Sequence, residues 1–152
     1  MTATLDTNVL VAAAHESGPR QERARALLDW VADGPGVVHL LWPTLIGFLR
    51  IVTHPTIFAR PLSPEDAGSA VERLVSRPHI RVGGELDEFW RNYRRVAGDV
   101  KPRGNLVPDA HLVALMLQHG ISTIWSNDRD LRKFSGITVK DPYDDRYSTG
   151  FA

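Results

Sequence analysis

Four aspartates have positions from which carboxylate chemistry could be built: Asp6, Asp109, Asp128 and Asp130. The first and the last two follow short apolar runs, and Asp109 opens a helical segment. Carboxylates held close together raise one another's pKa unless a cation neutralises them. Hard oxygen ligands without histidine or cysteine suit Mg²⁺ or Mn²⁺. Such an ion activates water and stabilises the charge that develops on a phosphodiester.

Each aspartate also fits an ordinary structural role. The sequence Asp6-Thr7-Asn8 is suited to capping a helix. Asp109 follows Pro108, and an acid in a first helical turn interacts favourably with the helix dipole. Spacing alone therefore leaves capping and metal binding both open.

The elements that must position these aspartates alternate along the chain. Apolar patterning and turn residues predict strands at residues 2–5, 37–41, 79–82, 121–125 and 137–139. They predict helices at residues 8–14, 21–32, 43–52, 64–76, 85–97 and 110–119. This alternation indicates an α/β protein with a mostly parallel sheet covered on both faces. Ligands bind beyond the carboxyl ends of such strands, and the first and fourth strands can be neighbours, so the aspartates could converge there.

The composition indicates one domain spanning residues 1–152, without repeats or linkers. Basic and acidic residues number 18 each, so no net charge points to nucleic acid or membrane. The absence of cysteine excludes disulfide scaffolds, thiolate metal sites and cysteine nucleophiles. The six histidines lack zinc-ligand spacing, and the chain has neither a Ser/His/Asp arrangement nor a phosphate-binding glycine loop. We expect a cytoplasmic protein that does not contact membranes.

Three segments, taken in order, resemble the acidic motifs of PIN-domain nucleases. They are LDTNVL at residues 5–10, GNLVPDAHLVA at 104–114 and SNDRDL at 126–131, the last followed by FSGI at 134–137. Residues 47–55, GFLRIVTHP, are also similar to a subgroup of VapC-type toxins. Each motif alone is weak, but their order and spacing are fairly specific and the match runs nearly end to end.

The resemblance implies a three-layer α/β/α fold and a metal-dependent endoribonuclease that uses Mg²⁺, or Mn²⁺, to activate water. It also implies a toxin of a type II toxin–antitoxin system, neutralised by a cognate antitoxin and usually a homodimer. By matching positions, Asp6 and Asp109 would be the principal metal ligands and Asp128 the third acid. Asp130 would be a further ligand.

One position departs from the family pattern. Many PIN nucleases place a glutamate on the helix after the second strand, where this chain has Gly47, and no acid lies between Asp33 and Glu65. Either the site works with fewer carboxylates, or Asp130 or a distant acid such as Asp99 substitutes. A glycine inside a helix needs its own reason, and we favour close packing at Gly47 with Asp130 as the fourth acid.

Several other residues have both a functional and a structural interpretation. Asn8 and Ser126 could support the aspartates, or could cap a helix and a turn. A cluster of basic residues could follow an RNA backbone or form a solvated helix face: Arg91, Arg94, Arg95, Lys101 and Arg103. Trp30, Trp42 and Trp90 are interpreted most simply as core or interface anchors.

Two other functions compete with the nuclease. A metal-dependent RNA-binding module with little or no cleavage activity would explain the missing glutamate at Gly47. A receiver-like or phosphatase-like domain would use Asp6 as a phosphoacceptor, but no paired acid stands next to Asp6.

Overall fold

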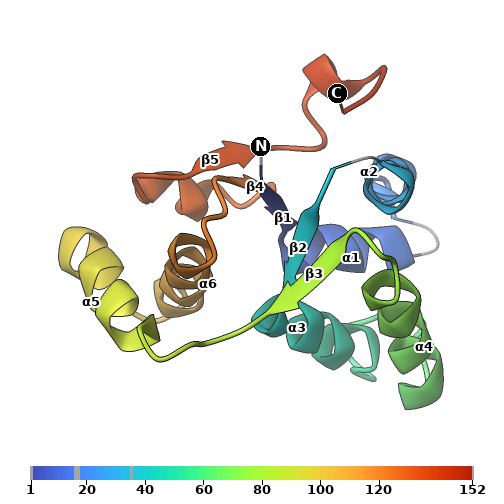
Figure 1. Cartoon of the computed structure of the whole chain (residues 1–152). Helices are drawn as coiled ribbons and strands as arrows, with labels where there is room; N and C mark the ends of the chain where they lie inside the picture. Colours follow the sequence, from blue (N-terminus) through green and yellow to red (C-terminus); the bar gives the residue numbers. More distant parts are fainter. Residues whose placement is uncertain (1, 16–17, 35, 152) are drawn as a thin grey trace.

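A five-stranded parallel sheet forms the centre of the computed structural model, which describes residues 2–15, 18–34 and 36–151 (Figure 1). The strands are β1 (Ala3–Leu5), β2 (Val38–Leu41), β3 (Ile80–Gly83), β4 (Thr123–Trp125) and β5 (Thr138–Lys140), in the order β3-β2-β1-β4-β5. The pairing places Leu5 opposite Trp125. The residues that follow β1 and β4 therefore begin at the same edge of the sheet, as the sequence predicts.

Helices cover both faces of the sheet. On one face lie α1 (Thr7–Ala14), α2 (Gln21–Asp33), α3 (Trp42–Val52) and α4 (Pro64–Val75), and on the other lie α5 (Phe89–Val100) and α6 (Leu106–Gln118) (Figure 1). Two short 3₁₀ helices, η1 (Arg129–Lys133) and η2 (Asp145–Tyr147), complete the fold. The predicted three-layer α/β/α architecture is confirmed, and every strand pair in the described part of the chain is parallel.

The core is divided by the sheet into two hydrophobic clusters. Successive side chains of a strand point to opposite faces. Leu40 accordingly joins the cluster under α1–α4, whereas Leu41 joins the cluster under α5 and α6. Trp125 and Ile124 divide in the same way on β4.

Two helices begin a full turn away from the predicted residue, whereas α1 and α3 begin one residue early. The helix expected at 85–97 begins at Phe89, because the preceding segment is tied to α6: Gln118 accepts a hydrogen bond from the Leu86 amide (3.0 Å) and donates one to the Gly84 carbonyl (2.8 Å). The helix expected at 110–119 begins at Leu106, because Pro108 is tolerated in a first turn. Asp109 therefore lies in the first turn of α6, and η1 was not predicted at all.

The tryptophans also differ from expectation. The exposed fractions of Trp30, Trp42 and Trp90 are 38%, 48% and 66%, so none of them is a buried core anchor, and their role as interface anchors stays a prediction. Trp125 is the buried tryptophan, and Tyr147 and Phe151 of the carboxyl-terminal tail pack against it. No helix in the described residues is long and apolar enough to cross a membrane.

Candidate functional site

Asp6 is held rigidly at the junction of β1 and α1. Its amide donates a hydrogen bond to the Trp125 carbonyl (3.0 Å), which continues the pairing of β1 with β4. Its Oδ1 accepts a hydrogen bond from the Thr7 amide (2.7 Å), and its Oδ2 accepts one from the Ser126 hydroxyl (2.6 Å). The Asp6 carboxylate therefore caps α1 and also lies at the edge of the sheet where β1 and β4 end.

Hydrogen bonds continue from Ser126 to the aspartates after β4. The buried Ser126 oxygen also accepts a hydrogen bond from the Asp128 amide (3.0 Å). Asp128 Oδ1 in turn accepts one from the Asp130 amide (2.9 Å), which caps η1. Ser126 thereby links the Asp6 carboxylate to the turn that carries the two later aspartates.

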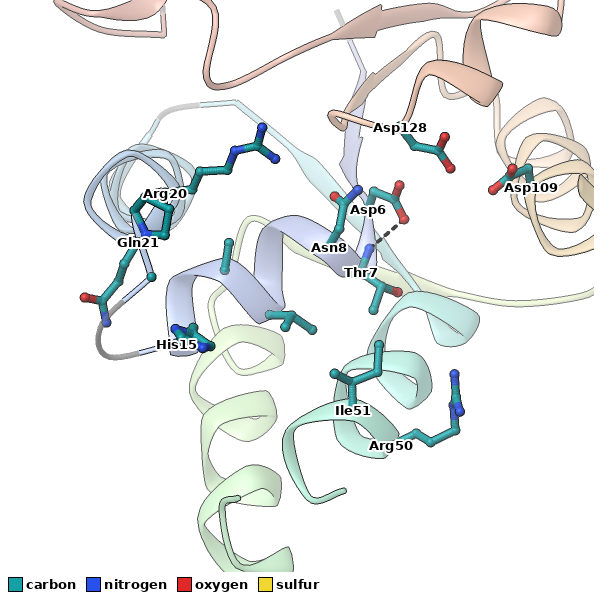
Figure 2. A pocket seen from close by; sticks show the side chains of 14 residues that line it. Asp6, Thr7, Asn8, His15, Arg20, Gln21, Arg50, Ile51, Asp109 and Asp128 are labelled. Atoms are coloured by element: carbon teal, nitrogen blue, oxygen red, sulfur yellow. Dashed lines mark hydrogen bonds between the residues drawn. The ribbon is translucent and has the colours of Figure 1, made fainter. Parts of the chain in front are cut away.

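Asp109, Asp128 and Asp130 form the tight acidic group of the site. One carboxylate oxygen from each lies within 4.8 Å of the others. Asp6 is next to this group rather than inside it: Asp6, Asp109 and Asp128 line one cavity of about 690 Å³. Figure 2 shows these three carboxylates at one end of the cavity, arriving from β1, α6 and the segment after β4.

The electrostatics of the group match what crowded carboxylates require. Burial, followed by repulsion from Asp128, Asp6 and Asp130, raises the pKa of Asp109 from 3.8 to about 7. Burial also raises the pKa of Asp6, although the hydrogen bonds from Ser126 and Thr7 oppose the shift. Lys133 pairs with Asp130 at 2.9 Å and offsets part of this negative charge.

The donor set fits a hard divalent cation. All the candidate donors are oxygen atoms, which Mg²⁺ and Mn²⁺ prefer. Asn8 lines the cavity one residue beyond Thr7, and its Oδ1 is buried without a hydrogen-bond partner among the described residues. A buried acceptor of this kind normally has a partner, so Asn8 Oδ1 is available to a bound water or ion.

The predicted basic cluster lies elsewhere on the described surface. None of its five members lines the cavity of the aspartates. Arg91, Arg94 and Arg95 border a separate hollow on α5, where Asp87 and Glu88 accompany them and Arg91 pairs with Glu88 at 2.9 Å. Lys101 ends α5 in the left-handed conformation (φ 54°).

Three cationic or titratable side chains at the cavity were not predicted from the sequence: His15, Arg20 and Arg50. One signal for Arg50 was present, because it is the only Asp, Glu, Lys or Arg between Asp33 and Arg60. A lone charge on an otherwise apolar helix indicates either a surface position or a function.

Gly47 lies where α3 closely approaches the start of α1. A Cβ atom at this position would be 3.0 Å from Thr7 Oγ1 and 3.3 Å from Thr7 Cγ2. The Thr7 hydroxyl itself donates a hydrogen bond to the Thr44 carbonyl of α3 (3.1 Å). Close packing against Thr7, the residue after Asp6, therefore explains why position 47 is a glycine.

Comparison with known proteins agrees with this fold. The model of the PIN domain family matches residues 3–137, so the chain belongs to the PIN domain family. Within that family it belongs with the VapC proteins: it is 57% identical over 143 residues to Ribonuclease VapC48 of Mycobacterium tuberculosis, covering 94% of this chain and 99% of that protein. Ribonuclease VapC43 of the same species is 35% identical over 92% of this chain and 95% of its own length.

Solved structures support the same fold at lower identity. VapC20 of Mycobacterium tuberculosis, described as a Sarcin-Ricin loop cleaving toxin, superposes with a TM-score of 0.63 at 17% identity, over 90% of this chain and 98% of that one. VapBC2 of Rickettsia felis, bound to a promoter DNA fragment, gives a TM-score of 0.67 at 14% identity, over 92% and 98%.

Proposed function

We propose that this protein is an Mg²⁺-dependent endoribonuclease that acts as the toxin of a toxin–antitoxin pair. The observation that carries the proposal is the meeting of Asp109, Asp128 and Asp130 beside Asp6 at one end of a cavity. Relatives at 57% and 35% identity are named ribonucleases, which supports RNA as the substrate.

Each residue has a distinct part in the proposed reaction. Asp6, Asp109, Asp128 and Asp130 would hold the cation, which supplies activation of water and stabilisation of charge on the phosphodiester. Ser126 fixes the rotamer of Asp6 through its 2.6 Å hydrogen bond. Asp109, whose pKa is raised to about 7, would have to give up its proton to serve as a ligand. Asn8 Oδ1, buried and without a partner among the described residues, would accept a hydrogen bond from a bound water and orient it.

Purified RNA and purified protein test this function. We expect the wild-type protein to cleave RNA in Mg²⁺ and not in EDTA, and Asp6→Asn to be inactive at an unchanged fold. Mapping RNA ends after induced expression, with Asp6→Asn alongside, would identify the target. Equal cleavage by the wild type and Asp6→Asn would overturn the proposal.

Gly47 supports a second candidate, an RNA-binding module with little or no cleavage. The acid that many PIN nucleases carry on this helix is absent, and α3 contains no carboxylate at all. RNA binding in Mg²⁺ without new RNA ends would favour this alternative.

The antitoxin is the partner that the family membership supports. VapBC2 of Rickettsia felis and VapBC of Salmonella typhimurium, both bound to DNA, are among the similar structures. A hollow of about 780 Å³ between α1, α2, α3 and α4 has the partly buried side chains of Leu28 and Leu74 among its lining residues, and we propose that it contacts such a partner. Phe48 and Leu45 also line this hollow, but they are buried in the protein's own core. Val52 belongs to the protein's own core. A chain that is expressed freely in its native host, without a partner and without a growth defect, would contradict the toxin assignment.

Self-association is also proposed. Ile46 and Leu86 expose 57% and 60% of their surface, and Trp42, one turn before Ile46, lies against Gly84. These exposed apolar side chains are the surface that we propose for contact with a second copy of the chain. Light scattering should give a dimer mass for the wild type and a monomer mass for Ile46→Glu.

A further inference from the structure

The cavity that contains the aspartates has a cationic side as well as an acidic end. Arg20 and Arg50 line it together with Asp6, Asp109 and Asp128. The two arginines come from different elements: Arg20 directly precedes α2, and Arg50 lies in the last turn of α3. Figure 2 shows them on opposite sides of α1, whose first turn carries Thr7 and Asn8.

Arg20 is held in place by the carboxyl-terminal tail. Its guanidinium lies over the ring of Tyr143, with 4.6 Å from Cζ to the ring centroid. The tail is itself fixed to α2, because Arg23 donates hydrogen bonds to the carbonyls of Pro142 (3.2 Å) and Asp144 (3.1 Å). A cation–π contact orients a guanidinium without neutralising it, so Arg20 keeps its full charge for a ligand.

Arg50 also keeps its charge. It is exposed, and no acid among the described residues pairs with it. It follows Gly47 by one turn on α3, and residues three apart share a helix face. Because Gly47 abuts Thr7, this face of α3 borders the start of α1, next to Asp6.

An RNA strand needs such charges. If the aspartates hold a cation against the scissile phosphate, as the proposed function requires, the flanking phosphates remain negative. Guanidinium groups bind phosphates through several aligned hydrogen bonds. Two unpaired guanidinium groups on either side of α1, sharing a cavity with the acidic end, have the arrangement that a bound strand requires.

We propose that Arg20 and Arg50 bind the backbone phosphates on the two sides of the scissile one, with Tyr143 as a positioning residue for Arg20. This assignment rests on the proposed ribonuclease function. It divides the cavity into an acidic end that cuts and two cationic contacts that align the strand. It also gives the carboxyl-terminal tail a role in the binding of substrate.

Binding of RNA and its salt dependence test the proposal. The probe is a short fluorescently labelled single-stranded RNA of mixed sequence, and the protein carries Asp109→Asn so that the RNA stays intact. We expect Arg20→Gln and Arg50→Gln each to weaken binding by about fivefold or more at low salt, and to reduce the slope of log affinity against log salt by about 0.7. Arg73→Gln, an exposed arginine on α4 outside this cavity, is the matched control and should match the parent.

Tyr143 is tested by two replacements. Tyr143→Phe keeps the aromatic ring under Arg20 and should bind RNA like the parent protein. Tyr143→Leu removes the ring and should weaken binding, with no further loss when Arg20→Gln is added. Weaker binding in both replacements, or in neither, would overturn the positioning role.

The outcomes separate this proposal from the ribonuclease function. If the wild type cleaves RNA but Arg20→Gln and Arg50→Gln bind and cleave it normally, the phosphate contacts are refuted and the function stands. The same holds if these variants impair only binding of the antitoxin. If the wild type does not cleave, yet the two variants lose affinity and salt slope, the contacts stand and the nuclease function fails.

Discussion

The Ser126 hydroxyl donates a 2.6 Å hydrogen bond to Asp6 Oδ2, across the pair of strands β1 and β4. The two residues are 120 positions apart in the chain, and each follows directly after its strand. The same serine oxygen accepts a hydrogen bond from the Asp128 amide. Two of the three acidic segments therefore share one buried hydroxyl, which makes Ser126 a residue that sets the geometry of the site.

Removing this hydroxyl should impair both the site and the fold. Ser126→Ala leaves the Asp128 amide without its acceptor and frees the rotamer of Asp6, so we expect kcat/KM for RNA to fall by about tenfold. The lost hydrogen bonds should lower the free energy of unfolding by about 1–3 kcal/mol. Cleavage rates and urea unfolding measure the two effects.

The control for this change is Ser122→Ala. Ser122 also donates a hydrogen bond across the β1–β4 pair, to the Thr2 carbonyl (3.2 Å), but it is exposed and does not line the cavity. We expect activity close to that of the wild type. Equal activity of Ser126→Ala and Ser122→Ala would contradict the role of Ser126.

Asp130 should be required for cleavage. Its carboxylate lies within the 4.8 Å group with Asp109 and Asp128, so Asp130→Ala removes a ligand and should lower kcat/KM by at least about tenfold at an unchanged melting temperature. The change also breaks the ion pair with Lys133, and Lys133→Gln breaks the same pair while keeping the acid. Full activity in Asp130→Ala, or an equal loss in Lys133→Gln, would refute the assignment.

The layers of this fold could be predicted because short-range patterns determine them. Alternating apolar segments with glycine and proline between them predicted all five strands and the sheet between helices. The helix boundaries could not be predicted where tertiary contacts decide them. The side chain of Gln118 holds the backbone at residues 84–86 out of a helix, and no local pattern reveals a partner more than 30 positions away.

The candidate site was likewise predictable in part: its acidic residues were found from the sequence, but their exact arrangement was not. The sequence places the aspartates after strands, and parallel pairing then brings Asp6 and Asp128 to one edge. It does not reveal that Asp109, Asp128 and Asp130 are the tight group while Asp6 lies beside it, because that depends on side-chain rotamers and on Ser126. Arg20 was also missed, since its place at the cavity depends on Tyr143 in the tail.

The metal-free protein should lose stability as the pH rises towards neutrality. The pKa of Asp109 is about 7 in the folded chain and 3.8 without the fold, so the folded state binds the extra proton. The stabilisation of the folded state by this proton on Asp109 is fully present below about pH 4 and is lost as the pH rises through about 7. In EDTA, we expect the melting temperature of the wild type to fall between about pH 5 and 8 relative to that of Asp109→Asn.

Added Mg²⁺ should reverse this loss. The cation competes with the proton on Asp109, so Mg²⁺ should raise the melting temperature more at about pH 8 than at about pH 5. Comparison with Asp109→Asn subtracts the titration of groups that do not interact with Asp109, including His39, whose pKa is lowered by burial and by its neighbours His119 and Arg81. Parallel melting curves for the two proteins across this pH range would contradict the linkage to Asp109.

Gly47 should tolerate alanine but not a larger side chain, because the side chain of Thr7 lies against it. Glycine in a helix costs about 1 kcal/mol relative to alanine, but a Cβ at Gly47 would be 3.0 Å from Thr7 Oγ1. Gly47→Ala should therefore be close to neutral, and Gly47→Glu should destabilise the fold by about 1–3 kcal/mol. In Thr7→Ala the nearest remaining atom is Thr7 Cβ at 3.7 Å, an ordinary contact.

A double-mutant cycle isolates this contact. Adding Gly47→Ala to Thr7→Ala should stabilise that variant by about 1 kcal/mol, the helix propensity of alanine without the clash. Thermal melts measure the stabilities of the four proteins in the cycle. A Mn²⁺ titration of Gly47→Glu tests the alternative, that position 47 is a vacated ligand position. A Gly47→Glu protein that melts like the wild type and binds Mn²⁺ more tightly would mean that the position is a vacated ligand site, and the packing explanation would fall.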